Sequence, residues 1–306
     1  MVRVCKDLFP HPSNPDKAGF YMEEPLKIQL DILLKNITKD WDFTIVISGQ
    51  GEVRLGKSMI AAQIGCYWNY MVKKLYGNDN PFTIEQNYVF DGKDLIRKGN
   101  ELGAKYPYSV LIFDEAGADL EGRKVMQTTT QLVMDYLREC GQYNMLNILV
   151  LPEFFDLPKG IAISRSCFLI DVYYSADSEG LFERGYFNFF SRRQKKLLYI
   201  YGKRDLNYYA VKQDLNGRFY KFFPLDEKAY KLAKIEVLKR RESKKSNKDK
   251  ILRDAAWYVL TKEANLSQKA LCMKMEALTG YYLPETTVSD ALAKFKYQEN
   301  DESDDN

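Results

Sequence analysis

The sequence has little of the residue patterns that many hydrolases, metal proteins and membrane proteins use. Its single histidine is His11, which leaves no Ser-His-Asp or Cys-His catalytic pair. Five cysteines are scattered without CxxC spacing, which argues against a zinc site and favours reduced thiols in a cytoplasm. No apolar run approaches the roughly 18 residues of a membrane helix. The first residues also lack the apolar stretch of a signal peptide. We therefore expect a cytoplasmic protein with no membrane segment.

What the chain does have is the composition of an ordinary folded protein. Hydrophobic residues make up 45% and charged residues 28% of its 306 residues. This length suffices for one substantial core and a smaller unit. The formal net charge is only +3, so any attraction for nucleic acid must come from local basic patches.

The first part of the chain alternates apolar runs with amphipathic stretches, a pattern typical of a parallel α/β sheet. We expect strands at 43–48, 87–90, 109–113, 146–151 and 167–174. We expect helices at 24–37, 57–75, 91–103 and 123–140.

The character of the chain changes after residue 178. Short aromatic stretches predict strands joined by turns at Tyr201-Gly202 and Asn216-Gly217. The expected division is a core domain at 1–178, a basic β-rich extension at 179–225, a helix and basic linker at 226–250, a small helical domain at 251–299 and an acidic tail at 300–306.

The segment GQGEVRLGKS, at 49–58, contains the pattern G-x-x-x-x-G-K-[ST] between an expected strand and an expected helix. In such a loop the backbone N–H groups surround phosphates, Lys57 reaches the β- and γ-phosphates, and Ser58 holds Mg²⁺. The alternative is an ordinary glycine-rich turn with a surface lysine. The strand–loop–helix context favours an ATP site. Its expected residues are Gly51, Glu52, Val53, Arg54, Leu55, Gly56, Lys57, Ser58 and Met59.

A second motif, SVLIFDEAGADL, places two acids at the end of an apolar strand. Asp114 is expected to support the magnesium ion, and Glu115 to polarise a water molecule against the γ-phosphate. This arrangement favours hydrolysis over transfer to a small acceptor. The alternative is a solvated acidic turn. An extra strand is expected at 87–90, between the two motifs in the sequence. Simple kinases lack such a strand, and additional-strand ATPases have it.

Together with the stretch YLRECGQYNMLNILVLPEF, these motifs resemble the RecA-like motor ATPases of the FtsK–HerA type over about residues 40–175. The closest likeness is to zonula-occludens-toxin-like and viral packaging members. The resemblance implies a RecA-like additional-strand P-loop NTPase core with a polar sensor at Glu153. The sensor is more often Gln, Asn or Thr, and the toxin-like relatives usually carry a membrane segment.

The resemblance also implies arginines that act on ATP. Arg138 lies on the helix before the fourth strand, and Arg165 precedes the last core strand. In a motor ring such an arginine contacts the γ-phosphate held by a neighbouring subunit, so both are candidate catalytic residues. Each has a surface ion pair as its alternative role. Arg54 resembles the arginine of terminase ATPases, shifted by one position, and either contacts a γ-phosphate or projects into solvent.

Two stretches are candidate DNA contacts. Residues 181–223 carry ten basic side chains against three acidic ones, interleaved with aromatic residues that either pack a core or stack on bases. The segment LPETTVSDALAKF resembles the recognition helix of a helix-turn-helix domain. In such a helix Val288, Ala291 and Leu292 would face inward, and Thr286, Thr287 and Ser289 would be exposed. A helical protein-docking module is the alternative. The expected DNA-binding residues are Arg192, Arg193, Lys195, Lys196, Thr286, Thr287 and Ser289.

These features favour an ATP-hydrolysing motor that translocates or packages double-stranded DNA for a virus or mobile element, in the host cytoplasm if viral. The expected cofactors are ATP and Mg²⁺. The expected partners are double-stranded DNA, further copies of the chain in a homo-oligomeric ring, and a portal or replication protein. The alternatives are an ATP-switched DNA-binding replication or partition factor and an ATP-dependent scaffold for virion assembly or secretion.

Overall fold

The computed structural model describes residues 1–116, 120, 128–245, 253, 254, 256–258, 260, 261, 265–279 and 282–293. The chain divides into two compact units, Met1–Val237 and Leu238–Asn306. Across the described ranges, no helix combines the length and apolarity that crossing a membrane requires.

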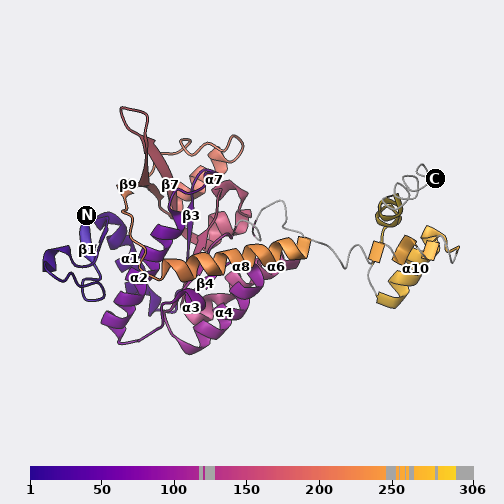
Figure 1. Cartoon of the computed structure of the whole chain (residues 1–306), viewed down its shortest axis with the longest axis horizontal. Coiled ribbons are helices and arrows are strands. Elements are labelled where there is room, and N and C mark those ends of the chain that lie inside the picture. The colour runs from indigo at the N-terminus through magenta and orange to yellow at the C-terminus, as the bar shows by residue number, and fades with distance from the viewer. Residues whose placement is uncertain are drawn as a thin grey trace. The chain divides into compact units, whose positions relative to one another are not determined.

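A seven-stranded sheet forms the centre of the first unit (Figure 1). Its strand order is β4-β5-β6-β3-β7-β8-β9. The first five strands in this order run parallel, and β8 and β9 continue the sheet in antiparallel pairing. A separate antiparallel pair joins β1 and β2. The strands are β1 (Val2–Val4), β2 (Phe20–Met22), β3 (Phe43–Ser48), β4 (Tyr88–Val89), β5 (Val110–Phe113), β6 (Leu146–Val150), β7 (Ser166–Ala176), β8 (Phe182–Phe190) and β9 (Leu215–Arg218).

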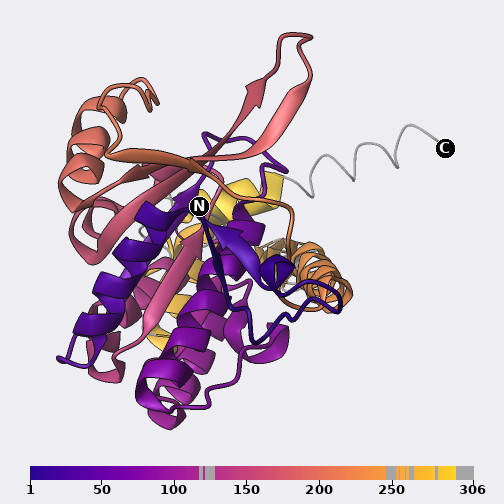
Figure 2. The same ribbon diagram turned by 90° about the vertical axis from the view of Figure 1, so that its left-hand side faces the viewer.

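Helices cover both faces of this sheet (Figures 1 and 2). The described helices of the first unit are α1 (Glu24–Ile37), α2 (Lys57–Tyr76), α3 (Ile84–Asn87), α4 (Gly92–Lys105), α6 (Thr128–Glu139) and α7 (Arg192–Gly202), together with residues 227–237 of α8 (Glu227–Lys245). Shorter helical turns are η1 (Pro15–Lys17), η3 (Cys140–Tyr143), η4 (Phe154–Asp156) and the π-helical η5 (Gly160–Arg165).

Alternating strand residues divide the interior into two hydrophobic clusters, as the period-two geometry of a strand requires. In β3, Ile45 and Ile47 belong to the cluster that α1 and α2 cover, whereas Val46 belongs to the cluster that α4, α6 and α7 cover. Residues of α8 pack against the first of these clusters. The expected parallel α/β arrangement is confirmed, and such a parallel-rich sheet fits a P-loop NTPase fold.

The sheet order shows where the expected extra strand lies in space. The extra strand expected at 87–90 is β4, which lies at the edge of the sheet beyond β5. The strand that lies in space between β3 and β5 is instead β6, which pairs with both of them. The loops that follow β3 and β5 therefore leave the same edge of the sheet with the width of one strand between them.

The expected β-rich extension is only partly made of strands, so that prediction is wrong over residues 192–202. These residues form α7, because Lys195, Leu198, Tyr199 and Gly202 recur at helical spacing and are buried on one face. The turn predicted at Tyr201-Gly202 is thus the end of a helix. The turn predicted at Asn216-Gly217 is also wrong, because both residues pair with β8 inside β9.

The hairpin of β7 and β8 extends beyond the rest of the sheet in both views (Figures 1 and 2). Farther along the chain, α8 runs to Lys245, so the expected basic linker is helical over 240–245. The remainder of that linker, 246–250, lies outside the described residues, as do the acidic tail and residues 123–127 of the fourth expected helix.

The second unit has a small hydrophobic core of its own. Helix α10 (Gln268–Thr279) begins after Ser267, whose hydroxyl accepts a 3.2 Å hydrogen bond from the Ala270 N–H. Residues 285–293 are also helical. The buried residues are Trp257, Leu271, Cys272, Val288, Ala291 and Leu292. The prediction that Val288, Ala291 and Leu292 face inward while Thr286, Thr287 and Ser289 are exposed is confirmed. The helix-turn-helix assignment itself stays a prediction.

Candidate active site

The loop between β3 and α2 has the backbone that a phosphate-binding turn requires. Gly51 and Gly56 have φ angles of +76° and +99°, in the left-handed region that favours glycine. Gly56 is the N-cap of α2, and a Cβ atom there would lie 3.0 Å from a ring carbon of Phe219. Gln50 and Arg54 also have positive φ angles, of 52° and 61°. The loop therefore curls tightly just before the helix begins.

Neighbouring strands hold this loop in place. The N–H groups of Gly49 and Gly51 donate hydrogen bonds of 3.1 and 3.0 Å to the carbonyl of Pro152, just after β6. The Gln50 side-chain amide donates to Asp171 of β7 over 2.9 Å. These bonds join the loop to the segment after β6 and to β7, the two strands that flank β3. Its shape is thus set by the sheet as well as by its glycines.

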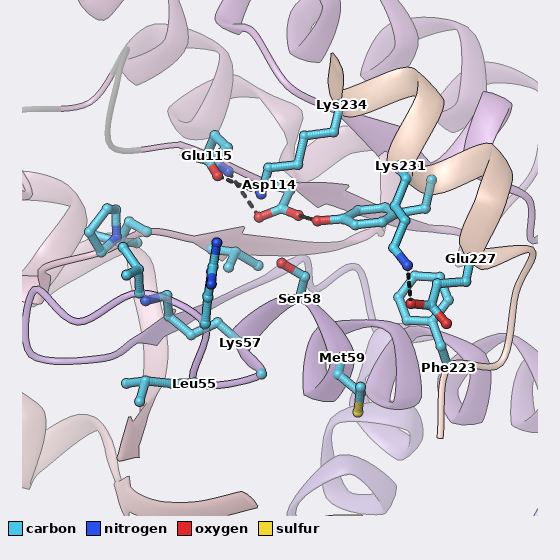
Figure 3. Close-up of a pocket in the computed structure, with 17 residues that line it drawn as sticks. Leu55, Lys57, Ser58, Met59, Asp114, Glu115, Phe223, Glu227, Lys231 and Lys234 are labelled. Atoms are coloured by element: carbon cyan, nitrogen blue, oxygen red, sulfur yellow. Dashed lines mark hydrogen bonds and ion pairs between the residues drawn. The ribbon is translucent and has the colours of Figure 1, made fainter. Parts of the chain in front are cut away.

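A pocket of about 410 Å³ opens beside the loop. It is lined by loop and helix residues 53–59, by Asp114 and Glu115, by the segment 150–152 and by α8 with the residues just before it (Figure 3). Gly51 and Glu52 belong to the same loop without lining the pocket. Its volume falls within the range of small-molecule sites, roughly 300–1,000 Å³.

Lys57, the first residue of α2, is half-buried. Its ammonium group folds back and donates a hydrogen bond to the carbonyl of Glu52. Burial lowers the pKa of Lys57, and the negative charges of Glu115 and Asp114 oppose that change. The lysine is therefore held within reach of both acids.

Asp114 is buried directly after β5, where the Tyr230 hydroxyl donates a 2.5 Å hydrogen bond to its Oδ2. The Ser58 hydroxyl at the start of α2 also stabilises the charged form of the Asp114 carboxylate. Burial raises the pKa of Asp114, and the charge of Lys234 together with these two hydroxyls opposes the rise. A hydroxyl and a carboxylate thus lie together at the start of α2.

These oxygen groups suit magnesium better than a softer metal. Mg²⁺ is usually held by one or two carboxylates together with water and substrate phosphates. Ser58 and Asp114 supply such a partial set. In the part of the chain that the structure describes, no three His, Cys, Asp or Glu side chains form a metal-binding group.

Glu115, the next residue, has a φ angle of +64° and a partly exposed side chain. Its Oε1 forms a 2.6 Å ion pair with Nζ of Lys234 on α8 (Figure 3). Lys231, one turn earlier, also lines the pocket but pairs with Glu227 over 2.7 Å.

Sequence reasoning missed the contribution of α8. The stretch 227–245 shows a basic helix, but no local pattern tells which strand ends it packs against. The one available signal is the four-residue spacing of Tyr230 and Lys234, which places both on one helix face.

The two candidate arginine fingers lie away from this pocket. Arg138 is exposed and pairs with Asp135 over 2.9 Å. Arg165 pairs with Asp42 and lies 3.5 Å from Sγ of Cys140, two residues after Arg138. Because β7 begins beside the start of β3, this cluster lies at the amino end of the strands, whereas the phosphate loop follows their carboxyl end. The two ends of β3, five residue steps from each other, are about 16 Å apart. A finger role for either arginine therefore needs a second subunit and stays a prediction.

Glu153, the expected polar sensor, stabilises a turn through hydrogen bonds. Its carboxylate accepts a 3.1 Å hydrogen bond from the Phe155 N–H, caps η4, and accepts a hydrogen bond from the Tyr208 hydroxyl. Burial raises the pKa of Glu153. Glu153 therefore fixes the turn whose Pro152 carbonyl anchors the phosphate loop.

Of the four residues predicted to bind DNA on α7, three are exposed and one is not. Arg192, Arg193 and Lys196 lie on the outer face of the helix. Lys195 is fully buried, and its ammonium group donates hydrogen bonds to the carbonyl of Ala162 and, over 2.9 Å, to the hydroxyl of Ser166. The prediction that Lys195 contacts DNA is therefore wrong, because its charge is used inside the protein.

No protein-family profile and no curated protein matches the sequence. Among solved structures, the chain is similar to the genome-packaging NTPase B204 of Sulfolobus turreted icosahedral virus 2 in complex with AMPPCP, with 15% identity, a TM-score of 0.35, and coverage of 50% of this chain and 94% of that one. The DNA-packaging ATPase B204 of Sulfolobus turreted icosahedral virus gives 18% identity, a TM-score of 0.35, and coverage of 51% and 95%.

The N-terminal domain of zonular occludens toxin from Neisseria meningitidis gives 13% identity, a TM-score of 0.34, and coverage of 49% and 84%. The two kinds of protein that the sequence was expected to resemble are thus both among the matches.

Proposed function

We propose that this chain is a magnesium-dependent ATPase. The observation that carries the proposal is that the phosphate loop, Asp114 and Glu115 converge on one pocket although they follow two different strands. The loop N–H groups and Lys57 would bind the phosphates, and the N-terminus of α2 favours their negative charge. Ser58 and Asp114 would hold Mg²⁺, which when bound neutralises charge on the phosphates.

Glu115 would act as the general base of hydrolysis. Its carboxylate takes a proton from a water molecule while the water oxygen forms a bond to the γ-phosphorus. The bond between the γ-phosphorus and the bridging oxygen breaks, and its electron pair stays on that oxygen. The products are ADP and inorganic phosphate. The partly exposed position of Glu115 at the pocket wall is compatible with contact to water.

Hydrolysis would drive the translocation or packaging of double-stranded DNA for a virus or mobile element. The outer face of α7 supports this proposal, because Arg192, Arg193 and Lys196 are exposed and are followed by exposed Lys203 and Arg204. Such a face binds phosphates without reading sequence. The exposed residues of the helix at 285–293, Thr286, Thr287 and Ser289, would add a second contact with DNA.

The working form would be a homo-oligomeric ring in which Arg138 or Arg165 reaches the γ-phosphate of a neighbouring subunit. A portal or replication protein would be a further partner. The distance of Arg138 and Arg165 from the phosphate loop of their own chain favours action on a second chain over action within one chain.

The test is ATP hydrolysis by the full chain with and without duplex DNA, measured together with the particle mass in ATP. We expect turnover that DNA stimulates and a mass of several chains, with Lys57→Ala as the control for contaminating activity. Turnover that ignores DNA would favour the assembly scaffold, and slow turnover with tight DNA binding would favour the switch. Nucleotide binding without any turnover would overturn the ATPase assignment.

A further inference from the structure

One helix contacts both acidic residues of the candidate active site. Tyr230 donates a hydrogen bond to Asp114, and Lys234 pairs with Glu115. The two contacting residues lie four positions apart, so they point in the same direction from α8. In Figure 3 the Lys234 side chain extends from α8 toward Glu115, and Lys231 points instead toward Glu227.

Aromatic packing fixes α8 in this position. The Tyr230 ring lies 5.8 Å from Tyr88, 5.9 Å from Phe90 and 5.2 Å from Phe223, measured between ring centroids. Ala233 and Val237 add to the same apolar face. Lys234 is therefore presented to the site by a packed helix, and its side chain is 31% exposed compared with 66% for Lys231.

The site requires positive charge near the γ-phosphate, where negative charge develops during hydrolysis. The described cationic side chains that line the pocket are those of Arg54, Lys57, Lys231 and Lys234. Arg54 is exposed, Lys57 already belongs to the loop proposed to bind the phosphates, and Lys231 pairs with Glu227. Of these four, Lys234 is the one whose ammonium group contacts the proposed general base.

We propose that Lys234 is a catalytic residue that acts within its own chain. When ATP binds, its ammonium group exchanges the Glu115 carboxylate for a γ-phosphate oxygen, which leaves Glu115 free to accept the proton of the attacking water. Tyr230 is a positioning residue, because its bond to Asp114 holds the helix that carries Lys234. The inference rests on the proposed ATPase function. A lysine suits this exchange because its ammonium group is a compact charge with three donors on a flexible stem.

The experiment compares Lys234→Ala, Lys234→Arg and the matched control Lys231→Ala in the full chain. We expect Lys234→Ala to lower the rate of a single turnover by about 10²–10³-fold, the usual effect of removing one group that stabilises the transition state. Lys234→Arg should restore part of the rate because it keeps the charge. Lys231→Ala should lower the rate far less than Lys234→Ala, because the Lys231 ammonium group pairs with Glu227 and not with Glu115. A rate for Lys234→Ala at or above the wild-type rate would overturn the proposal, because the lysine would then only hold Glu115 back.

A binding measurement separates this inference from the proposed function. A γ-phosphate contact predicts that Lys234→Ala binds AMPPCP about tenfold more weakly than the wild type while its affinity for ADP is unchanged. Tyr230→Phe should lower the ratio of AMPPCP affinity to ADP affinity by a smaller factor than Lys234→Ala does. An unchanged ratio would refute the positioning role of Tyr230. If the wild type binds nucleotides without hydrolysing ATP, the proposed function fails and the ratio still decides whether Lys234 contacts the γ-phosphate. If the ratio of AMPPCP affinity to ADP affinity is the same in the wild type and in Lys234→Ala, the proposed contact between Lys234 and the γ-phosphate is refuted.

Discussion

Replacing Lys195 by alanine tests whether this lysine holds the fold together or binds DNA. The substitution removes a fully buried side chain, and removing a buried side chain of this size costs about 2–5 kcal/mol. It also removes the ammonium donor of the Ser166 hydroxyl and of the Ala162 carbonyl, which keeps a 3.2 Å hydrogen bond from that hydroxyl, at about 1–3 kcal/mol. Burial lowers the pKa of Lys195 from 10.5 to about 8, so removing the charge returns about 3 kcal/mol. The net expectation is a loss of about 2 kcal/mol in the free energy of unfolding.

Urea unfolding and DNA binding measured on the same samples would check this expectation. Arg193→Ala is the matched control, because Arg193 lies on the exposed face of the same helix. It should change the free energy of unfolding by less than about 0.5 kcal/mol. It should also reduce the slope of log affinity for DNA against log salt by about 0.9, as expected for one lost phosphate contact.

The pH dependence adds a test with a defined sign. Because the folded-state pKa of Lys195 is lowered to about 8, the unfolded chain binds more protons than the folded chain between pH 8 and pH 10.5. The contribution of Lys195 to stability should therefore increase as the pH rises through that window. Lys195→Met, which keeps most of the side-chain volume, should lack this increase. Our reasoning would be refuted if Lys195→Ala kept wild-type stability and lowered the salt slope as Arg193→Ala does.

Three further predictions concern the proposed general base, the proposed action of an arginine on a neighbouring subunit and the proposed DNA-binding helix. Glu115→Gln should bind ATP but lose about 10²–10⁴-fold in hydrolysis, whereas Lys57→Ala should lose binding as well; a wild-type phosphate-release rate for Glu115→Gln would disprove the assigned base. If an arginine acts on a neighbouring subunit, Arg138→Ala or Arg165→Ala should bind ATP and hydrolyse it poorly, and mixing with Glu115→Gln subunits should restore some activity; a chain that stays monomeric with ATP and DNA contradicts this. Replacing Thr286, Thr287 and Ser289 together by alanine should reduce discrimination between DNA sequences without changing basal hydrolysis, and unchanged discrimination would favour protein docking.

Local patterns were sufficient to predict the strand–loop–helix unit around the phosphate loop. Residues 43–48 and 57–75 have the composition and spacing of their elements, and the observed β3 and α2 differ from the prediction by at most one residue. The apolar strand before Asp114 was predicted for the same reason. These segments adopt structures that their own sequence favours, so no knowledge of distant contacts was needed.

Local composition explains why strands were wrongly predicted for residues 192–202, which form α7. Aromatic residues in 197–201 favour strands by propensity, but burial follows the helical spacing of Lys195, Leu198 and Tyr199. A lysine in that buried series was interpreted as surface charge. Its burial depends on the carbonyl of Ala162 and the hydroxyl of Ser166, which are more than 25 residues away in the sequence and which no local pattern places beside it.

The contacts of α8 illustrate the same limit at the candidate active site, because two residues that contact its acids lie outside both sequence motifs. Asp114 and Glu115 are recognisable because a phosphate loop and a strand-terminal acid pair have fixed local signatures. Tyr230 and Lys234 have no such signature and reach the acids only because α8 packs on the apolar surface that Tyr88 and Phe90 help to form. A substitution that loosens this packing, such as Phe223→Ala, should therefore weaken the Lys234–Glu115 ion pair without touching either charge. If α8 carries a catalytic cation, Phe223→Ala should slow hydrolysis; if α8 only restrains Glu115, the same substitution should speed it.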